Sequence, residues 1–104
     1  MVRVIAVKSL KEFWVQHPES EQPLKAWHEE TKVATWSDPA ELKLAFGSAS
    51  ILQNGRVVFN IAGNKYRLIV GISYKLQIVF IKFVGAHRDY DKIDAQTVEW
   101  ESKP

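Results

Sequence analysis

The sequence contains no cysteine, and this absence excludes several classes of site. Disulfide frameworks, thiolate zinc sites, iron–sulfur clusters and cysteine nucleophiles all require that side chain. A chain without cysteine is expected in the reducing cytoplasm. No hydrophobic run approaches the roughly 18 residues of a membrane span, because even the longest one, Ile78–Phe83, is interrupted by Lys82. We therefore expect no contact with a membrane.

Several motifs of cofactor and metal chemistry are also missing. The sequence has no glycine-rich phosphate loop, no HExxH motif and no nucleophilic serine motif. His17 and His28 lack the spacing of metal ligands, so we expect them on the surface or at the edge of the core. The sequence predicts neither a metal site nor a cofactor.

Acidic side chains are absent from a long central stretch. Residues 42–88 contain no Asp or Glu, whereas the segments on both sides are net negative. The stretch has seven basic residues: Lys43, Arg56, Lys65, Arg67, Lys75, Lys82 and Arg88. This distribution is typical of a surface that binds polyanions, although a well-solvated sheet with Lys and Arg at its edges has the same pattern.

The residues that are present suit one small folded unit. The 104 residues are 46% hydrophobic and 12% aromatic, which is enough for a thin core built from large side chains. We expect residues 1–104 to form a single domain.

Hydrophobic periodicity predicts helices in the first half of the chain and strands in the second. A β-branched run at residues 2–7 precedes three helices, whose starts are indicated by a capping box at Ser9–Glu12, by Pro23, and by Asp38 followed by Pro39. Strands are predicted at residues 56–61, 65–74 and 78–84. The order β-α-α-α-β-β-β predicts an α+β fold, with the helices on one face of an antiparallel-rich sheet of about four strands.

The strand at residues 65–74 alternates strictly between two faces. Its larger hydrophobic side chains point one way, so Lys65 and Arg67 must project from the other face of the sheet. Their neighbours on that face are small or modest, and Gly71 is expected to leave the backbone open to close approach. Arg67 lies among apolar neighbours with no nearby carboxylate in the sequence, which favours an anionic ligand such as a phosphate. An ordinary solvated sheet face is the alternative.

A polar cluster at residues 85–92 follows the last strand directly. It includes His87, which can act as a general acid or base near neutral pH. Tyr90 can stack on a base, donate a hydrogen bond or move a proton. The alternative interpretation makes Asp89 the N-cap of a short C-terminal turn that ends at Ile93.

Two segments together carry a family resemblance. Residues 58–67 have the pattern F-N-x-x-G-N-x-x-R, and residues 83–91 have H-x-x-Y-D after the last strand. With both patterns, nearly the whole chain resembles the HigB toxins, a branch of the RelE-like ribonucleases of bacterial type II toxin–antitoxin systems. The resemblance implies a RelE-like fold and an enzyme that cuts mRNA, usually in the ribosomal A site. It also implies a HigA-type helix-turn-helix antitoxin, so that contact with DNA is only indirect.

The resemblance also implies residue roles. Arg67 would stabilise the phosphorane, with His87 and Tyr90 as acid/base or base-stacking groups. The residues expected to contact RNA are Arg56, Asn60, Lys65, Lys82, Arg88 and Lys92. A non-catalytic RNA- or ribosome-binding module with the same basic face remains an alternative, as does a toxin-like fold kept only to bind an antitoxin. The sequence leaves open whether Trp100 and the acidic end from Glu99 pack on the basic face.

Overall fold

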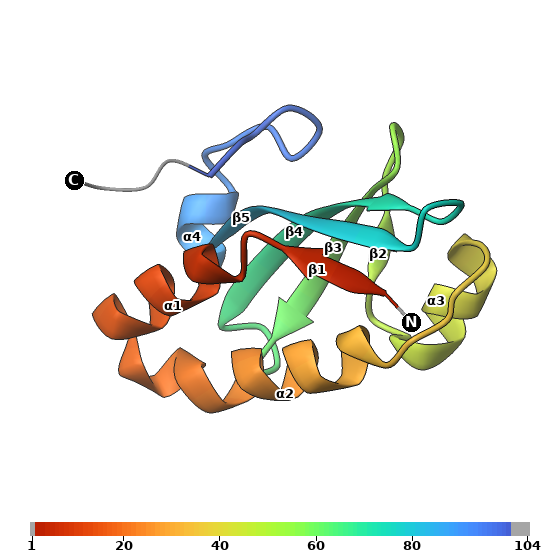
Figure 1. The fold of residues 1–104 in the computed structure, drawn as a ribbon. Helices are drawn as coiled ribbons and strands as arrows, with labels where there is room; N and C mark the ends of the chain where they lie inside the picture. Colours follow the sequence, from red (N-terminus) through yellow and green to blue (C-terminus); the bar gives the residue numbers. More distant parts are fainter. Residues whose placement is uncertain (1, 101–104) are drawn as a thin grey trace.

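The computed structural model describes residues 2–100, and it has the predicted α+β architecture (Figure 1). In chain order the elements are β1 (Arg3–Ile5), α1 (Val7–Gln16), a single 3-10 turn η1 (Pro18–Ser20), α2 (Glu21–Lys32), α3 (Pro39–Ala45), β2 (Ser50–Ile51), β3 (Arg56–Ile61), β4 (Tyr66–Ser73), β5 (Ile78–Ala86) and α4 (His87–Tyr90). None of the helices between residues 2 and 100 has the length and hydrophobicity of a membrane span.

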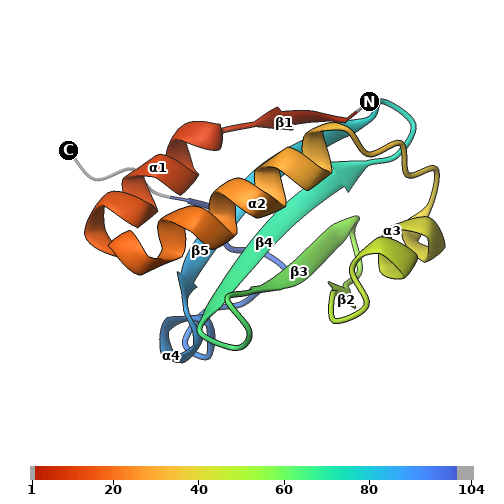
Figure 2. The same ribbon diagram turned by 90° about the horizontal axis from the view of Figure 1, so that it is seen from below.

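The sheet has five strands in the order β1-β5-β4-β3-β2. Only β1 and β5 pair in parallel, and the other neighbours are antiparallel. The additional strand relative to the predicted four is β2, whose two residues are too short to produce a recognisable period in the sequence. Helices α1 and α2 lie across one face of this sheet (Figure 2).

The hydrophobic core lies between these helices and the sheet. Tyr66, Leu68 and Val70 of β4 are buried in it, as their alternation predicts. On the helical side, Leu24 and Trp27 of α2 are buried against them. The opposite, outer face of β4 therefore carries Arg67 and Ile69, two residues apart.

Helix α1 begins three residues earlier than predicted. Its N-cap is Ala6, a left-handed residue with φ 71° and no side-chain cap, and Ser9 lies buried within the helix. The prediction of a capping box at Ser9 was wrong because β1 ends at Ile5. The chain passes from β1 into α1 through Ala6 alone, and this tertiary arrangement outweighs the local capping signal.

The other two helix starts agree better with the sequence. Asp38 caps α3 by accepting a hydrogen bond from the Glu41 amide at 2.9 Å, and Pro39 occupies the first helical position. Helix α2 begins at Glu21 and not at Pro23, which lies in its first turn. A proline there loses no intrahelical hydrogen bond, because the first-turn amides have no partner within the helix.

The pairing of β4 with β5 contains a β-bulge. Ile69 pairs with Phe83 and Val70 pairs with Ile81, so Lys82 has no partner opposite it. The methylene stem of Lys82 lies over Gly71, with its Cε 3.3 Å from the position that a Cβ on Gly71 would occupy. The bulge thereby places an additional cation on the outer face of the sheet.

Candidate functional site

Register places Arg67 in the middle of a row across the outer face. Asn60 of β3 and Gly85 of β5 are its direct partners on either side. Directly opposed residues on antiparallel strands share a face, so all three lie on the side away from α1 and α2. Arg67 is half-buried there, beside a glycine that presents no side chain.

Helix α4 brings two further predicted residues to Arg67. The His87 amide donates to the Lys65 carbonyl at 3.1 Å, which ties the start of α4 to the turn before β4. One turn later the ring of Tyr90 lies under the Arg67 guanidinium, 5.8 Å from its carbon to the ring centroid. Arg67 of β4 is thus brought together with His87 and Tyr90 of α4 in one cluster.

The positive charge of Arg67 has no carboxylate partner among the ion pairs of residues 2–100. Its Nη1 donates to the carbonyl oxygens of Asn64 at 3.2 Å and Tyr66 at 3.4 Å. These bonds hold the guanidinium in place without neutralising it. The geometry therefore retains a fixed cation with the capacity to bind a phosphate.

His87 is 52% exposed, and its Nε2 lies 3.6 Å from Oδ1 of Asp91. A carboxylate at this distance restricts the orientation of the imidazole ring. Asp91 was not among the predicted site residues. The signal that could have found it is the i, i+4 spacing within H-x-x-Y-D, which places both side chains on one face of a helical turn.

The alternative role predicted for Asp89 is wrong. The N-cap of α4 is Ala86, which has no side-chain cap, and Asp89 lies inside the helix. The capping carboxylate of this region is Asp94, which accepts a hydrogen bond from the Gln96 amide at 2.9 Å. Asp94 begins a separate turn after α4, in which the Thr97 and Val98 amides donate to its carbonyl oxygen and its side chain caps the Gln96 amide.

The remaining predicted RNA contacts divide into two groups. Lys65, Arg88 and Lys92 are all exposed, and they lie in the β3–β4 turn, on α4 and directly after α4. These three cations therefore surround the Arg67 cluster. Asn60 lies in the same row as Arg67. Its Nδ2 also donates a hydrogen bond to the Ser48 carbonyl at 3.4 Å and thereby holds the segment before β2.

Arg56 and Lys82 form the second group, away from α4. Arg56 Nη2 lies 2.8 Å from Glu99 Oε2, and Lys82 Nζ lies 2.9 Å from Glu99 Oε1. Arg56 Nη1 also donates to the carbonyl oxygens of Ala95 and Val98, at 3.2 and 2.7 Å. The structure therefore does not bring these two cations to the Arg67 cluster and gives them an internal carboxylate instead.

The outer face is consequently less open than the sequence predicts. Residues 93–100, here called the C-terminal strap, run along this face on the side opposite α2 (Figure 1). Between the two cationic groups, Ile69 is 0% and Val58 3% exposed, and the space over Gly71 holds the Lys82 stem. The acidic end packs on the basic face at Glu99, and its part beyond Trp100 lies outside the described residues.

Glu99 is held ionised by this arrangement. The hydrogen bond from Lys82, followed by that from Arg56, lowers the pKa of Glu99 against the opposing effect of burial. A carboxylate shared by a guanidinium and an ammonium gains two charge-assisted hydrogen bonds, which favour the charged form.

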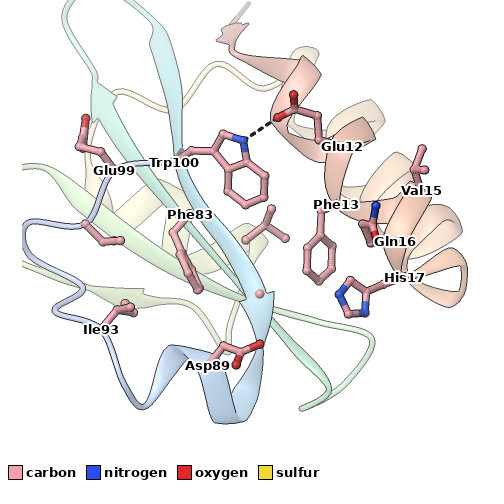
Figure 3. A pocket seen from close by; sticks show the side chains of 13 residues that line it. Glu12, Phe13, Val15, Gln16, His17, Phe83, Asp89, Ile93, Glu99 and Trp100 are labelled. Atoms are coloured by element: carbon pink, nitrogen blue, oxygen red, sulfur yellow. Dashed lines mark hydrogen bonds between the residues drawn. The ribbon is translucent and has the colours of Figure 1, made fainter. Parts of the chain in front are cut away.

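A groove of about 800 Å³ lies beside the site, between α1 and the strap (Figure 3). Phe13, Phe83 and Trp100 line it, and the Trp100 indole donates to Glu12 at 2.7 Å across it. Gly85 lies in its floor under the ring of Phe83. Its lining does not include Arg67, His87 or Tyr90, so the cationic cluster lies on the open surface next to the groove.

Comparison with known proteins identifies the family. The model of the HigB toxin family, described as the RelE-like toxic component of a toxin–antitoxin system, matches residues 20–93. The chain belongs to the HigB toxin family. The match includes Arg67, His87 and Tyr90, and it ends before Glu99. The resemblance inferred from the two sequence patterns is thus confirmed, and a toxin of this kind has a cognate antitoxin.

Curated HigB proteins resemble the chain over most of its length. It is 26% identical to the mRNA interferase toxin HigB of Escherichia coli K12 over 92 residues, which are 86% of this chain and 88% of that protein. The same values hold for the proteins named mRNA interferase HigB in Escherichia coli O157:H7 and Shigella flexneri.

Proposed function

We propose that this HigB-family toxin is a metal-independent endoribonuclease that cleaves mRNA in the cytoplasm and thereby inhibits translation. The family and the names of its relatives support the enzyme class. The observation that supports the mechanism most directly is the Arg67 guanidinium, fixed over Tyr90 beside His87 and free of any carboxylate among the described residues. Residues 1–104 act as one functional unit.

The chemistry needs only side chains of this cluster. The 2′-hydroxyl of the ribose loses a proton and attacks the adjacent phosphorus, forming a bond to O2′ and breaking the bond to O5′. The O5′ leaving group takes up a proton, which gives a 2′,3′-cyclic phosphate and a 5′-hydroxyl end. Arg67 stabilises the charge on the pentacoordinate phosphorane. His87 and Tyr90 are the groups that transfer protons or hold the base.

The surrounding cations position the RNA backbone. Lys65, Arg88 and Lys92 contact phosphates on either side of the scissile one, and Asn60 contacts RNA from the row of Arg67. Lys65, Arg88 and Lys92 are exposed, and 52% of the His87 side chain is exposed. Cleavage in such an open site is faster when the substrate is already held in the reactive conformation. The ribosomal A site would hold mRNA in this way.

The antitoxin partner is of the HigA type, a helix-turn-helix protein, and the toxin contacts DNA only through it. Binding of such a partner suppresses toxicity by covering or distorting the Arg67 cluster. Co-expression of a neighbouring helix-turn-helix gene should restore growth and retain the toxin on an affinity-tagged antitoxin. Growth arrest that persists during co-expression would contradict this partner.

The test of the nuclease is cleavage of an mRNA bound to purified ribosomes, read by primer extension. Arg67→Ala and His87→Ala should each remove the discrete new ends, while Lys75→Ala, an exposed cation away from the cluster, should leave them. Circular dichroism melting of each variant checks that it is folded. Equal cleavage by the parent and both site variants would refute the site. Ribosome binding without new ends would instead favour the non-catalytic module.

A further inference from the structure

The C-terminal strap contacts the sheet through an anion held between two cations. The carboxylate oxygens of Glu99 are divided between Arg56 and Lys82, one oxygen to each. The Arg56 side chain is only 12% exposed, and it also binds two strap carbonyls. A guanidinium and an ammonium that converge on a planar anion form the kind of site that binds carboxylate and phosphate alike.

The two cations lie on the same face of the sheet as the proposed cleavage site, on the strands that flank β4. Arg56 is opposite Gly71, which is four residues along β4 from Arg67. At the rise of a β-strand this is a separation of about 13 Å. Val58 and Ile69, which lie between the Arg67 cluster and these two cations, are buried at 3% and 0% exposure. A single RNA strand laid along β4 therefore meets both cationic groups only after the strap has moved off this part of the face.

Besides the Arg56 hydrogen bonds to its carbonyl oxygens, the strap has two attachments through its own side chains, and these differ in chemical kind. Trp100 packs against the core and donates to Glu12 on α1, so this attachment does not involve the basic face. Glu99 is attached by charge, and 59% of its side chain is exposed. Salt and competing anions weaken such an exposed ion pair far more than they weaken apolar packing. The contact with Glu99 is therefore the one that a polyanion can replace.

We propose that Arg56 and Lys82 form a second phosphate-binding subsite, which Glu99 occupies in the free protein and from which RNA displaces it. The identity of the ligand rests on the function proposed above, whereas the anion site itself rests on the geometry of these three residues. The strap thus lowers the affinity of the free toxin for RNA. An RNA strand long enough to span both cationic groups displaces it. Arg56 and Lys82 lie within the family match, and Glu99 lies outside it.

The direct test is the affinity of Glu99→Gln for a fluorescein-labelled, 12-nucleotide 2′-O-methyl RNA, which binds but cannot be cleaved. Removing the internal carboxylate charge should tighten binding by about fivefold or more, the lower end of a typical coupling between two ligands. Glu29→Gln, an equal charge change on the exposed side of α2, is the matched control. Glu99→Gln binding no tighter than Glu29→Gln would overturn the proposal.

A double variant assigns the gain to the subsite. Adding Lys82→Ala to Glu99→Gln should abolish the tighter binding, because it removes one of the two cations that were released. If the gain survives in the double variant, it does not come from this subsite and the proposal fails. Both comparisons are made at several salt concentrations. Each phosphate contact makes the logarithm of the affinity for a single strand fall by about 0.7 for each log unit of added salt.

Hydrogen exchange of the parent protein gives a readout that needs no variant. Saturating 2′-O-methyl RNA should increase the exchange of amides in residues 94–100 while protecting β4. Unchanged or slower exchange in the strap would contradict displacement. This result is independent of the cleavage assay: if Arg67→Ala and His87→Ala still cleave but the strap is displaced, the subsite stands and the proposed catalytic site does not.

Discussion

The Arg67 guanidinium lies over the Tyr90 ring, 5.8 Å from its centroid, and this contact connects the central strand of the sheet to the short helix after the last strand. Neither residue has a carboxylate partner among the described ion pairs. The ring therefore orients the cation without cancelling its charge. A site that must stabilise a phosphorane needs this combination of fixed position and retained charge.

Replacement of Arg67 should affect the rate strongly and the fold weakly. Arg67→Ala removes the cation that faces the phosphorane, and we expect ribosome-dependent cleavage to fall by about 10²–10³. Arg67→Lys keeps the charge but loses the planar fork, so its rate should lie between those of Arg67→Ala and the parent. Single-turnover cleavage and melting temperature measured together separate these effects. An Arg67→Ala protein that cleaves at the parental rate would remove the residue from the site.

Two substitutions of Tyr90 distinguish its ring from its hydroxyl. Tyr90→Ala removes the ring under Arg67, and the loss of a cation–π contact should lower the cleavage rate by about 2- to 30-fold. Tyr90→Phe keeps the ring and should retain most of the activity if stacking is its role. A Phe variant as slow as the Ala variant would instead assign the hydroxyl to proton transfer. The measurement is the same single-turnover assay.

Gly85 is required by the ring of Phe83. A Cβ at Gly85 would lie 2.6 Å from Cζ of Phe83, whereas one at Gly47 would meet nothing within 4 Å. Gly85→Ala should therefore cost about 1–3 kcal/mol in the free energy of unfolding through overpacking. Gly47→Ala is the control and should be close to neutral. Chemical denaturation of both variants checks this, and equal midpoints would show that Phe83 moves away freely.

The contact of Glu99 with Lys82 and Arg56 should depend on pH in a defined direction. These partners lower the pKa of Glu99, so its contribution is fully present above the unfolded-state pKa and is lost as the pH falls through the depressed folded-state value. We expect the strap to stay in place at neutral pH and to loosen only in acid. Tryptophan fluorescence during acid titration follows this change, with Glu99→Gln as the reference because Trp14, Trp27 and Trp36 also contribute to the signal. Glu99→Gln should abolish the acid transition at the strap, and a transition that is unchanged in this variant would contradict the assignment.

Much of the fold could be predicted because it depends on local pattern. The alternation in β4 correctly separated Tyr66 and Leu68 from Arg67, since the two faces of a strand follow from its backbone geometry. The N-cap at Asp38 was found for the same reason, because capping is a contact between residues three positions apart. At Ser9 an equally good local signal failed, because the position where β1 ends determined the start of α1.

The residues of the candidate site could also be predicted from the sequence, but their arrangement in space could not. Arg67, His87 and Tyr90 carry recognisable chemistry and family patterns, so they could be named as candidates. Their grouping depends on the register of β4 with β5, which local patterns constrain only weakly. Asp91 was missed because its importance comes from its distance to His87 and not from its residue type.

By itself the sequence determined which residues face the core, which strand carries Arg67 outward, and to which family the chain belongs, because these depend on short-range periodicity and motif. Only the tertiary structure decided that Glu99 meets Arg56, a partner 43 positions away in the chain. Such a contact depends on the path of the backbone after α4 and on a bulge that turns Lys82 to the same face, and neither leaves a periodic signature. Of the basic residues in the acid-free stretch, Lys65, Arg67 and Arg88 lie in the open candidate cluster, whereas Arg56 and Lys82 hold Glu99. Only three-dimensional proximity separates the open cluster from the occupied anion site.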